Sequence, residues 1–386
     1  MKFNALESWR GLCAIGVVLV HVSLATHILD LPPVQNAGFG VDFFFVLSGF
    51  VLAHAYSERL KGAADARNFL IRRIGRLLPL HLVMLAFMVL LELAKLVMVT
   101  KFHVNAGQAP FSAETSLTAL GASVVLVNGL GILPYYAWNG PSWSISTEFW
   151  AYLLFLGACL AGARLYRLGA VTLCVLCGGA LWLLDLYHVE LHTYEGAGVL
   201  RCLFGFSGGM LVNLAYRRIV AHGWAAPAWL EYVAVIAVAG VFCGIVPWAR
   251  TLGPIVFGFA IFVFAFESGA ISRVLKTRVP LHLGQISYSI YLVHFPLLAV
   301  VNGVARAAQS VLHVPLYHQS ANGTWILSFG NVWLNDLVLV ALLLLIVGVA
   351  TLTYRLIENP GREYFNRLAG RRDTIAPSPA RSVAVP

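Results

Sequence analysis

The sequence predicts an all-α membrane protein with about ten spanning helices, and two observations lead to this fold class. Of the 386 residues, 59% are hydrophobic and 11% are charged, and the mean hydropathy is +0.80. A soluble globular domain carries about 25% charged residues, so a soluble fold of this length could not cover its surface. The apolar residues also recur in segments close to the ~20 residues that a spanning helix needs.

Ten apolar segments are long enough to be read as spanning helices. They are residues 9–29, 41–57, 77–99, 143–162, 170–187, 198–215, 229–246, 253–268, 281–301 and 334–354.

An eleventh apolar stretch, residues 117–133, is predicted to be an interfacial or re-entrant helix that does not span. With this assignment and a cytoplasmic N-terminus, 20 of the 26 lysines and arginines lie in cytoplasmic segments, as the positive-inside rule requires. If residues 117–133 spanned, every later basic loop would face outward. Both termini are therefore expected in the cytoplasm.

The chain is expected to form one transmembrane domain, residues 1–364, followed by a disordered cytoplasmic tail, residues 365–386, which lacks apolar periodicity. The net charge of +9 is explained by the cytoplasmic loops, so nucleic-acid binding is not expected. The six cysteines fall in apolar stretches, and Cys174 and Cys177 have no second ligand pair. We therefore expect neither a metal site nor a disulfide.

The first spanning segment contains two residues that are costly inside a membrane, Arg10 and His21. Their separation of 11 positions is about 20° more than three helical turns, so both face one side, about 16 Å apart along the axis. Imidazole exchanges protons near neutral pH, which makes His21 a candidate general base. A neutral core histidine bonded to a neighbouring helix is the alternative interpretation.

The second and third spanning segments carry charge at opposite ends. Asp42 begins the second at the outer face, and Ser48-Gly49 permits close helix approach. The third begins at a basic group, Arg72-Arg73-Ile74-Gly75-Arg76, in which Arg73 and Arg76 share a helical face. Arginine is suited to bidentate phosphate binding. Anchoring at the membrane surface is the alternative.

Three later stretches carry polar or charged groups. Glu148 lies one turn into the fourth segment, where it could orient His21, bind a sugar hydroxyl, or reach the interface as a snorkelling carboxylate. Tyr288 and Tyr291 share one face of the ninth segment, with His294 near it. Residues 354–360 close the tenth segment at the inner face, and their charges are first interpreted as a membrane stop.

In this order and spacing, these stretches resemble the acyltransferase-3 family of bacterial membrane acyltransferases. The resemblance covers nearly the whole chain, from Leu6-Glu7-Ser8-Trp9-Arg10-Gly11 to Glu358-Asn359-Pro360. The matching elements between them are Arg10-x10-His21, Gly40 to Phe50, Arg73-Ile74-Gly75-Arg76 with Pro79, and Trp143-Ser144-Ile145-Ser146-Thr147-Glu148. Thr147 stands where the family often has valine.

The resemblance implies transfer of an acyl group, usually acetyl, from cytosolic acyl-CoA to an extracytoplasmic carbohydrate such as a polysaccharide. It implies that His21 and Arg10 are catalytic, and we add Glu148 as a third candidate; Arg72, Arg73 and Arg76 are expected to bind the donor. No tightly bound cofactor is expected, and the location is a bacterial inner membrane. The acceptor site is assigned to Asp42, Trp143, Ser144, Tyr288, Tyr291 and His294.

Two other functions fit the same residues. A transporter or channel could use Arg10, His21 and Glu148 as a proton or ion relay, although no internal repeat of the kind common in transporters is visible. A non-catalytic membrane scaffold is the third possibility. Thiol release that depends on the donor would separate the enzyme from both.

Overall fold

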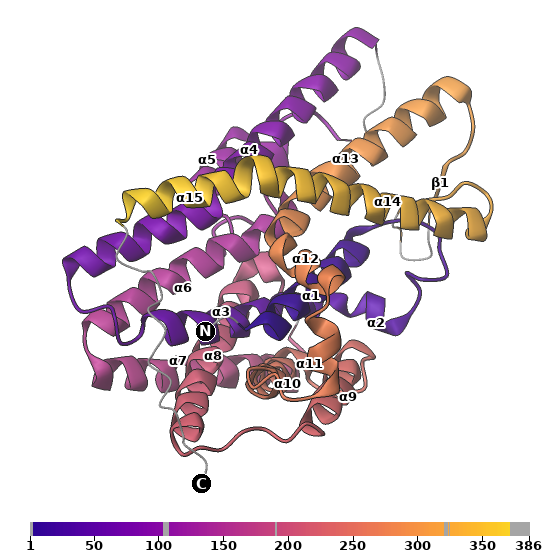
Figure 1. Cartoon of the computed structure of the whole chain (residues 1–386). Helices are drawn as coiled ribbons and strands as arrows, with labels where there is room; N and C mark the ends of the chain where they lie inside the picture. The colour runs from indigo at the N-terminus through magenta and orange to yellow at the C-terminus, as the bar shows by residue number, and fades with distance from the viewer. Residues whose placement is uncertain (1–2, 103–107, 190, 320–322, 324, 371–386) are drawn as a thin grey trace.

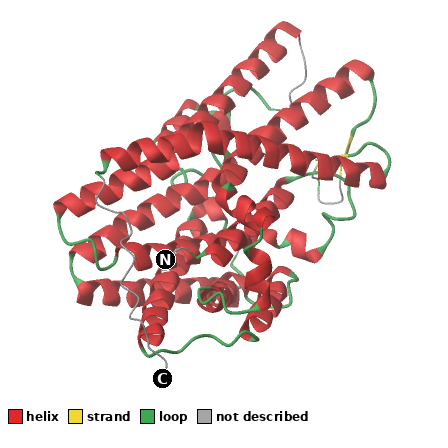
Figure 2. Cartoon of the chain, viewed as in Figure 1, coloured by secondary structure: helices red, strands yellow, loops and turns green. Residues whose placement is uncertain are grey.

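The computed structural model describes residues 3–102, 108–189, 191–319, 323 and 325–370. This part of the chain is almost entirely helical (Figures 1 and 2). Its two short strands, β1 (Tyr317–Gln319) and β2 (Trp325–Leu327), pair antiparallel, with His318 opposite Ile326. The predicted all-α fold class therefore agrees with the structure.

The helices follow one another in chain order, with η marking 3-10 turns except for η5, which is a π-helical turn. They are α1 (Asn4–His21), α2 (Pro32–Gln35), η1 (Ala37–Phe39), α3 (Gly40–Tyr56), α4 (Ala63–Phe102), η2 (Ala113–Thr115), α5 (Leu117–Val124), η3 (Gly140–Ser142), α6 (Trp143–Leu160), α7 (Ala163–Leu186), η4 (Thr193–Glu195), α8 (Ala197–Ala221), α9 (Leu230–Phe242), α10 (Ala249–Phe264), α11 (Ala270–Leu275), α12 (Arg278–Gln285), α13 (Ser287–Leu312), α14 (Val332–Thr353), η5 (Tyr354–Glu358) and α15 (Asn359–Leu368).

Each of the ten predicted spanning segments overlaps a helix, and the segment 281–301 overlaps two, α12 and α13. Within the described residues, seven helices are long and apolar enough to cross a membrane: α3, α4, α6, α7, α8, α13 and α14, the last continuing through η5 into α15. The remaining predicted spans correspond to α9 and α10, which are apolar but shorter, and to α1, which carries Glu7 and Arg10. The chain is thus a helical polytopic membrane protein, and the count of ten spans is not confirmed.

Two ion pairs show that α3 and α8 run parallel. Asp42, at the start of α3, pairs with Arg201 at the start of α8, and Glu58, just beyond α3, pairs with Arg217 near the end of α8. Two parallel spanning helices must be separated by an odd number of membrane crossings. Helices α4, α6 and α7, which lie between α3 and α8 in the chain, provide three. The remaining helix of that interval, α5, has eight residues and spans only about 12 Å. This agrees with the non-spanning assignment of residues 117–133.

Small residues allow α3 and α8 to approach at backbone distance. A Cβ added to Gly49 would lie 1.9 Å from the carbonyl oxygen of Phe206, and one added to Gly209 would lie 2.0 Å from that of Val46. Packing of this kind is the main attraction between helices where lipid removes the hydrophobic driving force. The close approach predicted from Ser48-Gly49 is confirmed at Gly49.

The C-terminal helix α15 packs along the first part of α4 (Figure 1). A Cβ on Gly75 would lie 2.1 Å from the Cβ of Phe365, and a Cβ on Gly361 would lie 2.8 Å from that of Pro79. The glycine and the proline of the basic motif in α4 therefore contact α15, while Arg73 and Arg76 face the cavity described below.

Several predicted boundaries differ from the structure. Helix α4 begins at Ala63 instead of residue 77, and the predicted segment 281–301 is divided between α12 and α13, the second of which continues to Leu312. The first helix ends at His21 instead of residue 29, because the chain turns there to pair with β2: the Ala25 amide donates to the Leu327 carbonyl at 3.0 Å. At the other end, α15 continues to Leu368, so residues 365–368 of the predicted tail are helical. The rest of that tail, from residue 371, lies outside the described residues.

Candidate active site

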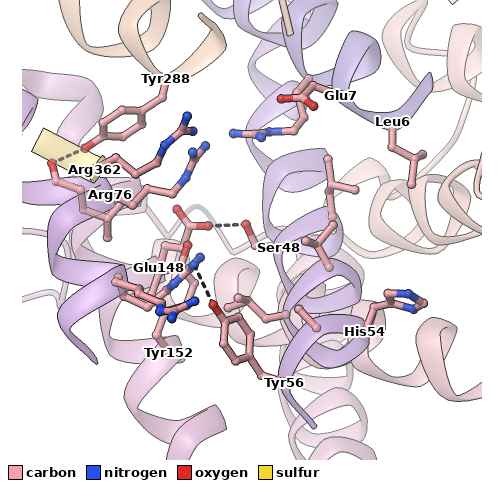
Figure 3. A pocket seen from close by; sticks show the side chains of 18 of the residues that line it. Leu6, Glu7, Ser48, His54, Tyr56, Arg76, Glu148, Tyr152, Tyr288 and Arg362 are labelled. Atoms are coloured by element: carbon pink, nitrogen blue, oxygen red, sulfur yellow. Dashed lines mark hydrogen bonds between the residues drawn. The ribbon is translucent and has the colours of Figure 1, made fainter. Parts of the chain in front are cut away.

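A cavity of about 540 Å³ lies among α1, α3, α4, α6, α13 and α15 (Figure 3). Its polar lining is Glu7, Arg10, Ser48, His54, Tyr56, Arg72, Arg73, Arg76, Glu148, Tyr152, Tyr288, Arg362 and Asn366. Five residues predicted to bind the donor or act in catalysis thus meet in one place although they come from three helices: Arg10, Arg72, Arg73, Arg76 and Glu148.

Positive charge dominates this cavity. Five arginines line it against two glutamates. Among the described residues, none of the ion pairs includes Arg10, Arg73 or Arg76. Because its lining carries more positive than negative charge, the cavity is suited to an anionic ligand.

Aromatic rings orient Arg73. Its guanidinium carbon lies 5.6 Å from the ring centre of Tyr56, 5.9 Å from that of Phe69 and 5.9 Å from that of Tyr152. These distances are within the range of cation–π attraction, which favours the flat guanidinium. Arg73 is thereby positioned without a carboxylate to neutralise it.

Arg76 lies beside Arg73 on the cavity wall, so the predicted shared face is confirmed. Its guanidinium carbon is 5.9 Å from the ring centre of Tyr288, whose hydroxyl donates to the Leu77 carbonyl at 2.6 Å. Arg72 also lines the cavity, and it donates to the Gly370 carbonyl at 3.2 Å. All three predicted donor-binding arginines therefore belong to the cavity.

Glu148 faces the cavity from α6 and accepts a hydrogen bond from Ser48 of α3 (Figure 3). From the sequence, His21 was one possible partner for this carboxylate. The structure gives it Ser48 instead, because α6 and α3 bring the two side chains together on the cavity wall.

A small recess of about 50 Å³ adjoins the cavity where Ser48 and Glu148 lie. Arg10, Ser48, Glu148 and Tyr288 line both the cavity and the recess. Beyond these four, the recess is bounded by Val41, Phe44, Phe45, Ser144, Ile145, Ser287 and Tyr291.

His21 is outside both spaces and lies against His294. The two imidazole centres are 5.0 Å apart, and the centre of Tyr291 is 5.9 Å from that of His294. His21 Nδ1 is 2.7 Å from the Val17 carbonyl oxygen. His294 is fully buried, and its Nε2 has no hydrogen-bond partner among the described residues.

The expected common face of Arg10 and His21 is directed toward α13, since Arg10 shares the recess with Tyr288 and His21 contacts His294. Tyr291, one turn before His294 on α13, stands between the recess and the histidine pair.

Two residues predicted to bind the acceptor have partners within the protein. Asp42 has 0% exposure, and its two oxygens accept from Arg201 Nε at 3.0 Å and Nη2 at 2.7 Å. Trp143 is buried against Phe45 and lies 5.7 Å from the Arg201 guanidinium carbon. Neither lines the cavity or the recess. Asp42 joins α3 to α8, and Trp143 of α6 packs beside that ion pair.

Three residues near the cavity were not recognised from sequence. Tyr152 and Arg362 line it, while Glu358 is 2% exposed, accepts from Ser289 at 2.7 Å and acts electrostatically on Arg76. Arg362 is placed by the packing of α15 on α4. The π-helical turn at η5, a feature frequent at functional sites, turns Glu358 inward, although its charge suggested a membrane stop.

Comparison with known proteins identifies the family to which the chain is similar. The family described as the acyltransferase domain matches residues 3–355. Over 94% of its length the chain is 26% identical to the putative membrane-bound transacylase BcsY of Komagataeibacter xylinus, covering 83% of that protein. It is 24% identical to the acyltransferase MdmB of Streptomyces mycarofaciens, with 98% of this chain and 95% of the relative covered.

A shorter match, to protein 2 in the picA locus of Rhizobium radiobacter, is 33% identical over 38% of this chain and 77% of the relative. No solved structure matches the chain. Because the family match extends over most of the chain, from the Arg10 segment to the end of α14, this protein belongs to the acyltransferase-3 family and is an acyl-transferring membrane enzyme.

Proposed function

We propose that the protein is an O-acyltransferase of the bacterial inner membrane. It moves an acyl group, expected to be acetyl, from cytosolic acyl-CoA to a hydroxyl of an extracytoplasmic carbohydrate or glycoconjugate. The observation that carries the proposal is the excess of arginine over carboxylate in the lining of one cavity, which brings Arg73 and Arg76 together with Arg10 and Glu148.

The donor occupies the large cavity. Coenzyme A carries a diphosphate and a 3′-phosphate, and arginine forks bind phosphate oxygens in pairs. Arg73 and Arg76, supported by Arg72 and Arg362, bind these phosphates. The pantetheine arm then extends inward and places the thioester beside Ser48 and Glu148. The positive-inside rule assigns these arginines, together with both termini, to the cytoplasmic side of the membrane.

The acceptor reaches the thioester from the side of His21. Its hydroxyl oxygen attacks the thioester carbonyl, a C–O bond forms as the C–S bond breaks, and coenzyme A leaves as the thiolate. His21 takes the hydroxyl proton, a role that typically accelerates a reaction by about 10²–10⁴-fold. Tyr291 lies between the recess and the histidine pair, so it must move aside when the acceptor enters.

The test is thiol release from acetyl-CoA by the purified protein in lipid nanodiscs, with and without a carbohydrate acceptor. Arg76→Ala is expected to weaken binding of coenzyme A, measured by calorimetry, by about 10-fold or more, as the loss of a charged hydrogen bond implies. Arg67→Ala, which removes an exposed arginine of the same helix outside the cavity, should leave binding unchanged.

Equal binding by the two variants would refute the donor site. Substrate flux across the membrane without any use of acyl-CoA would instead support the transporter interpretation.

A further inference from the structure

The histidine proposed as the base has surroundings suited to a positive charge, but no carboxylate is among them. His21 is the last residue of α1, and the C-terminal end of a helix carries partial negative charge. Within the described part of the chain, no carboxylate hydrogen-bonds to His21. A catalytic histidine is often supported by such a carboxylate. Any group that supports the protonated form of His21 must therefore be of another kind.

Hydrogen bonds to the backbone determine which nitrogen of each imidazole carries the hydrogen. A carbonyl oxygen accepts and cannot donate, so His21 Nδ1 donates to the Val17 carbonyl at 2.7 Å. His294 Nδ1 likewise donates to the Ile290 carbonyl at 3.1 Å. A neutral imidazole has one N–H, so Nε2 is the unprotonated nitrogen in both rings. Because each Nδ1 faces a carbonyl of its own helix, each Nε2 points away from that helix.

The Nε2 atom of His294 is buried without a donor. His294 has 0% exposure, and this nitrogen has no hydrogen-bond partner among the described residues. A buried acceptor without a donor lowers stability, so the nitrogen does not stabilise the resting fold. The His21 ring centre is 5.0 Å from that of His294, and its charge acts on His294. The unused lone pair therefore belongs to the ring that lies against the proposed base.

The two rings are in contact without a hydrogen bond because neither Nε2 has a hydrogen to give to the other. This changes when His21 takes a proton, since both of its nitrogens then carry hydrogens. The geometry then offers one buried acceptor beside the new Nε2–H of His21, which is Nε2 of His294.

We propose that His294 is a positioning residue that supports the protonated form of His21. His21 Nε2 takes the proton of the acceptor hydroxyl as its oxygen bonds to the thioester carbonyl carbon, and coenzyme A leaves as the thiolate. The new Nε2–H of His21 then donates to Nε2 of His294, which itself takes no proton. His21 later releases the proton to water, and water supplies the proton of the coenzyme A thiol. The proposal rests on the proposed function, because it takes His21 as the base of that transfer.

The experiment separates stability from rate by replacing His294 with leucine. Leucine removes the nitrogen that has no donor, so His294→Leu should be as stable as the wild type, or more stable, when unfolded in mixed micelles. Its kcat for thiol release from acetyl-CoA should fall by about 10- to 150-fold, the range that loss of a hydrogen bond to a charged group implies. The KM for acetyl-CoA should keep the wild-type value. A purely structural role predicts the opposite, which is lost stability with the rate unchanged.

His294→Gln tests the hydrogen bond itself. The side-chain carbonyl oxygen of glutamine can accept in place of Nε2 but cannot hold a proton. It should therefore restore most of the rate lost in His294→Leu. The acceptor probe is methyl glucoside at high concentration, and the slower transfer to water, which needs the same base, is measured without it.

The matched control is His81→Leu. His81 is 1% exposed, and its Nδ1 also has no partner among the described residues, but its Nε2 lies 2.9 Å from the Ser123 carbonyl oxygen and its ring is not part of the His21 pair. The kcat of this variant should equal the wild-type value. A loss equal to that of His294→Leu would show a general effect of packing and overturn the inference.

Wild-type kcat in folded His294→Leu would overturn the inference and leave the proposed function intact, and so would an equal loss in His294→Leu and His294→Gln. Nitrogen NMR of the wild-type protein with labelled histidine needs no variant and decides the matter even if His294→Leu fails to fold. A hydrogen on Nε2 of His294 at rest would overturn the inference, because that nitrogen could not accept. If the wild-type protein neither releases thiol nor binds free coenzyme A, the proposed function itself has failed.

Discussion

Replacing Asp42 with alanine should destabilise the protein without altering its recognition of the acceptor. Asp42 has 0% exposure, and Arg201 binds both of its oxygens. Removing the carboxylate leaves the Arg201 guanidinium, whose side chain is 14% exposed, without its counter-ion. Loss of one partner of a buried pair costs about 3–5 kcal/mol, which shifts the unfolding equilibrium by about 10²- to 10³·⁵-fold.

The same two helices provide a matched control. Glu58 pairs with Arg217 near the other ends of α3 and α8, but Glu58 is 77% exposed. An exposed pair contributes about 0–1 kcal/mol, so Glu58→Ala should unfold almost like the wild-type protein. The double variant Asp42→Leu with Arg201→Met should recover most of the stability lost in Asp42→Ala, because it removes both charges and fills the space.

The assay is unfolding in mixed micelles, followed by helical circular dichroism as the fraction of denaturing detergent rises. Below the unfolding transition, the KM of Asp42→Ala for the acceptor should equal the wild-type value. The reasoning would be refuted by a protein as stable as the wild type that has a strongly raised KM for the acceptor. Asp42 would then bind substrate, as the sequence suggested.

Three further outcomes are expected. Arg73→Lys retains the charge but loses the planar group beside three aromatic rings. Its affinity for coenzyme A, measured by calorimetry, should fall by about 5- to 30-fold, the equivalent of about 1–2 kcal/mol. An unchanged affinity would contradict the cation–π account. His21→Ala should leave coenzyme A binding intact but abolish transfer, and near-normal transfer by the folded variant would make His21 a packing residue. Gly209→Val should prevent normal folding, judged by size-exclusion chromatography, because its Cβ would lie 2.0 Å from a carbonyl oxygen of α3. The control Gly208→Ala, with open space at its Cβ, should behave like the wild type. Similar behaviour of both variants would exclude tight packing at Gly209.

The helical elements could be predicted because hydropathy is a property of neighbouring residues along the chain. Every apolar segment marked as a span became a helix, and the basic loops placed residues 117–133 outside that set, in agreement with the eight-residue α5 and the parallel α3 and α8. At the end of α1, where a predicted boundary was wrong, a partner distant in sequence decided the outcome: the Ala25 amide donates to the Leu327 carbonyl.

The candidate donor-binding arginines could also be predicted from the sequence, because local helical geometry places Arg73 and Arg76 on one face. Their neighbours were not. Arg362 reaches them only because Gly75 and Pro79 receive α15, and Ser48 meets Glu148 across 100 positions of sequence.

The sequence alone thus determined the membrane fold class, the family and the cationic end of the site. Only the tertiary structure decided that Asp42 pairs with Arg201, that His21 lies against His294, and that a small recess ends at Tyr291. The physical reason is that spanning is determined by the local balance of apolar and charged groups. Which side chains share a cavity depends instead on how helices distant in sequence approach and rotate against one another.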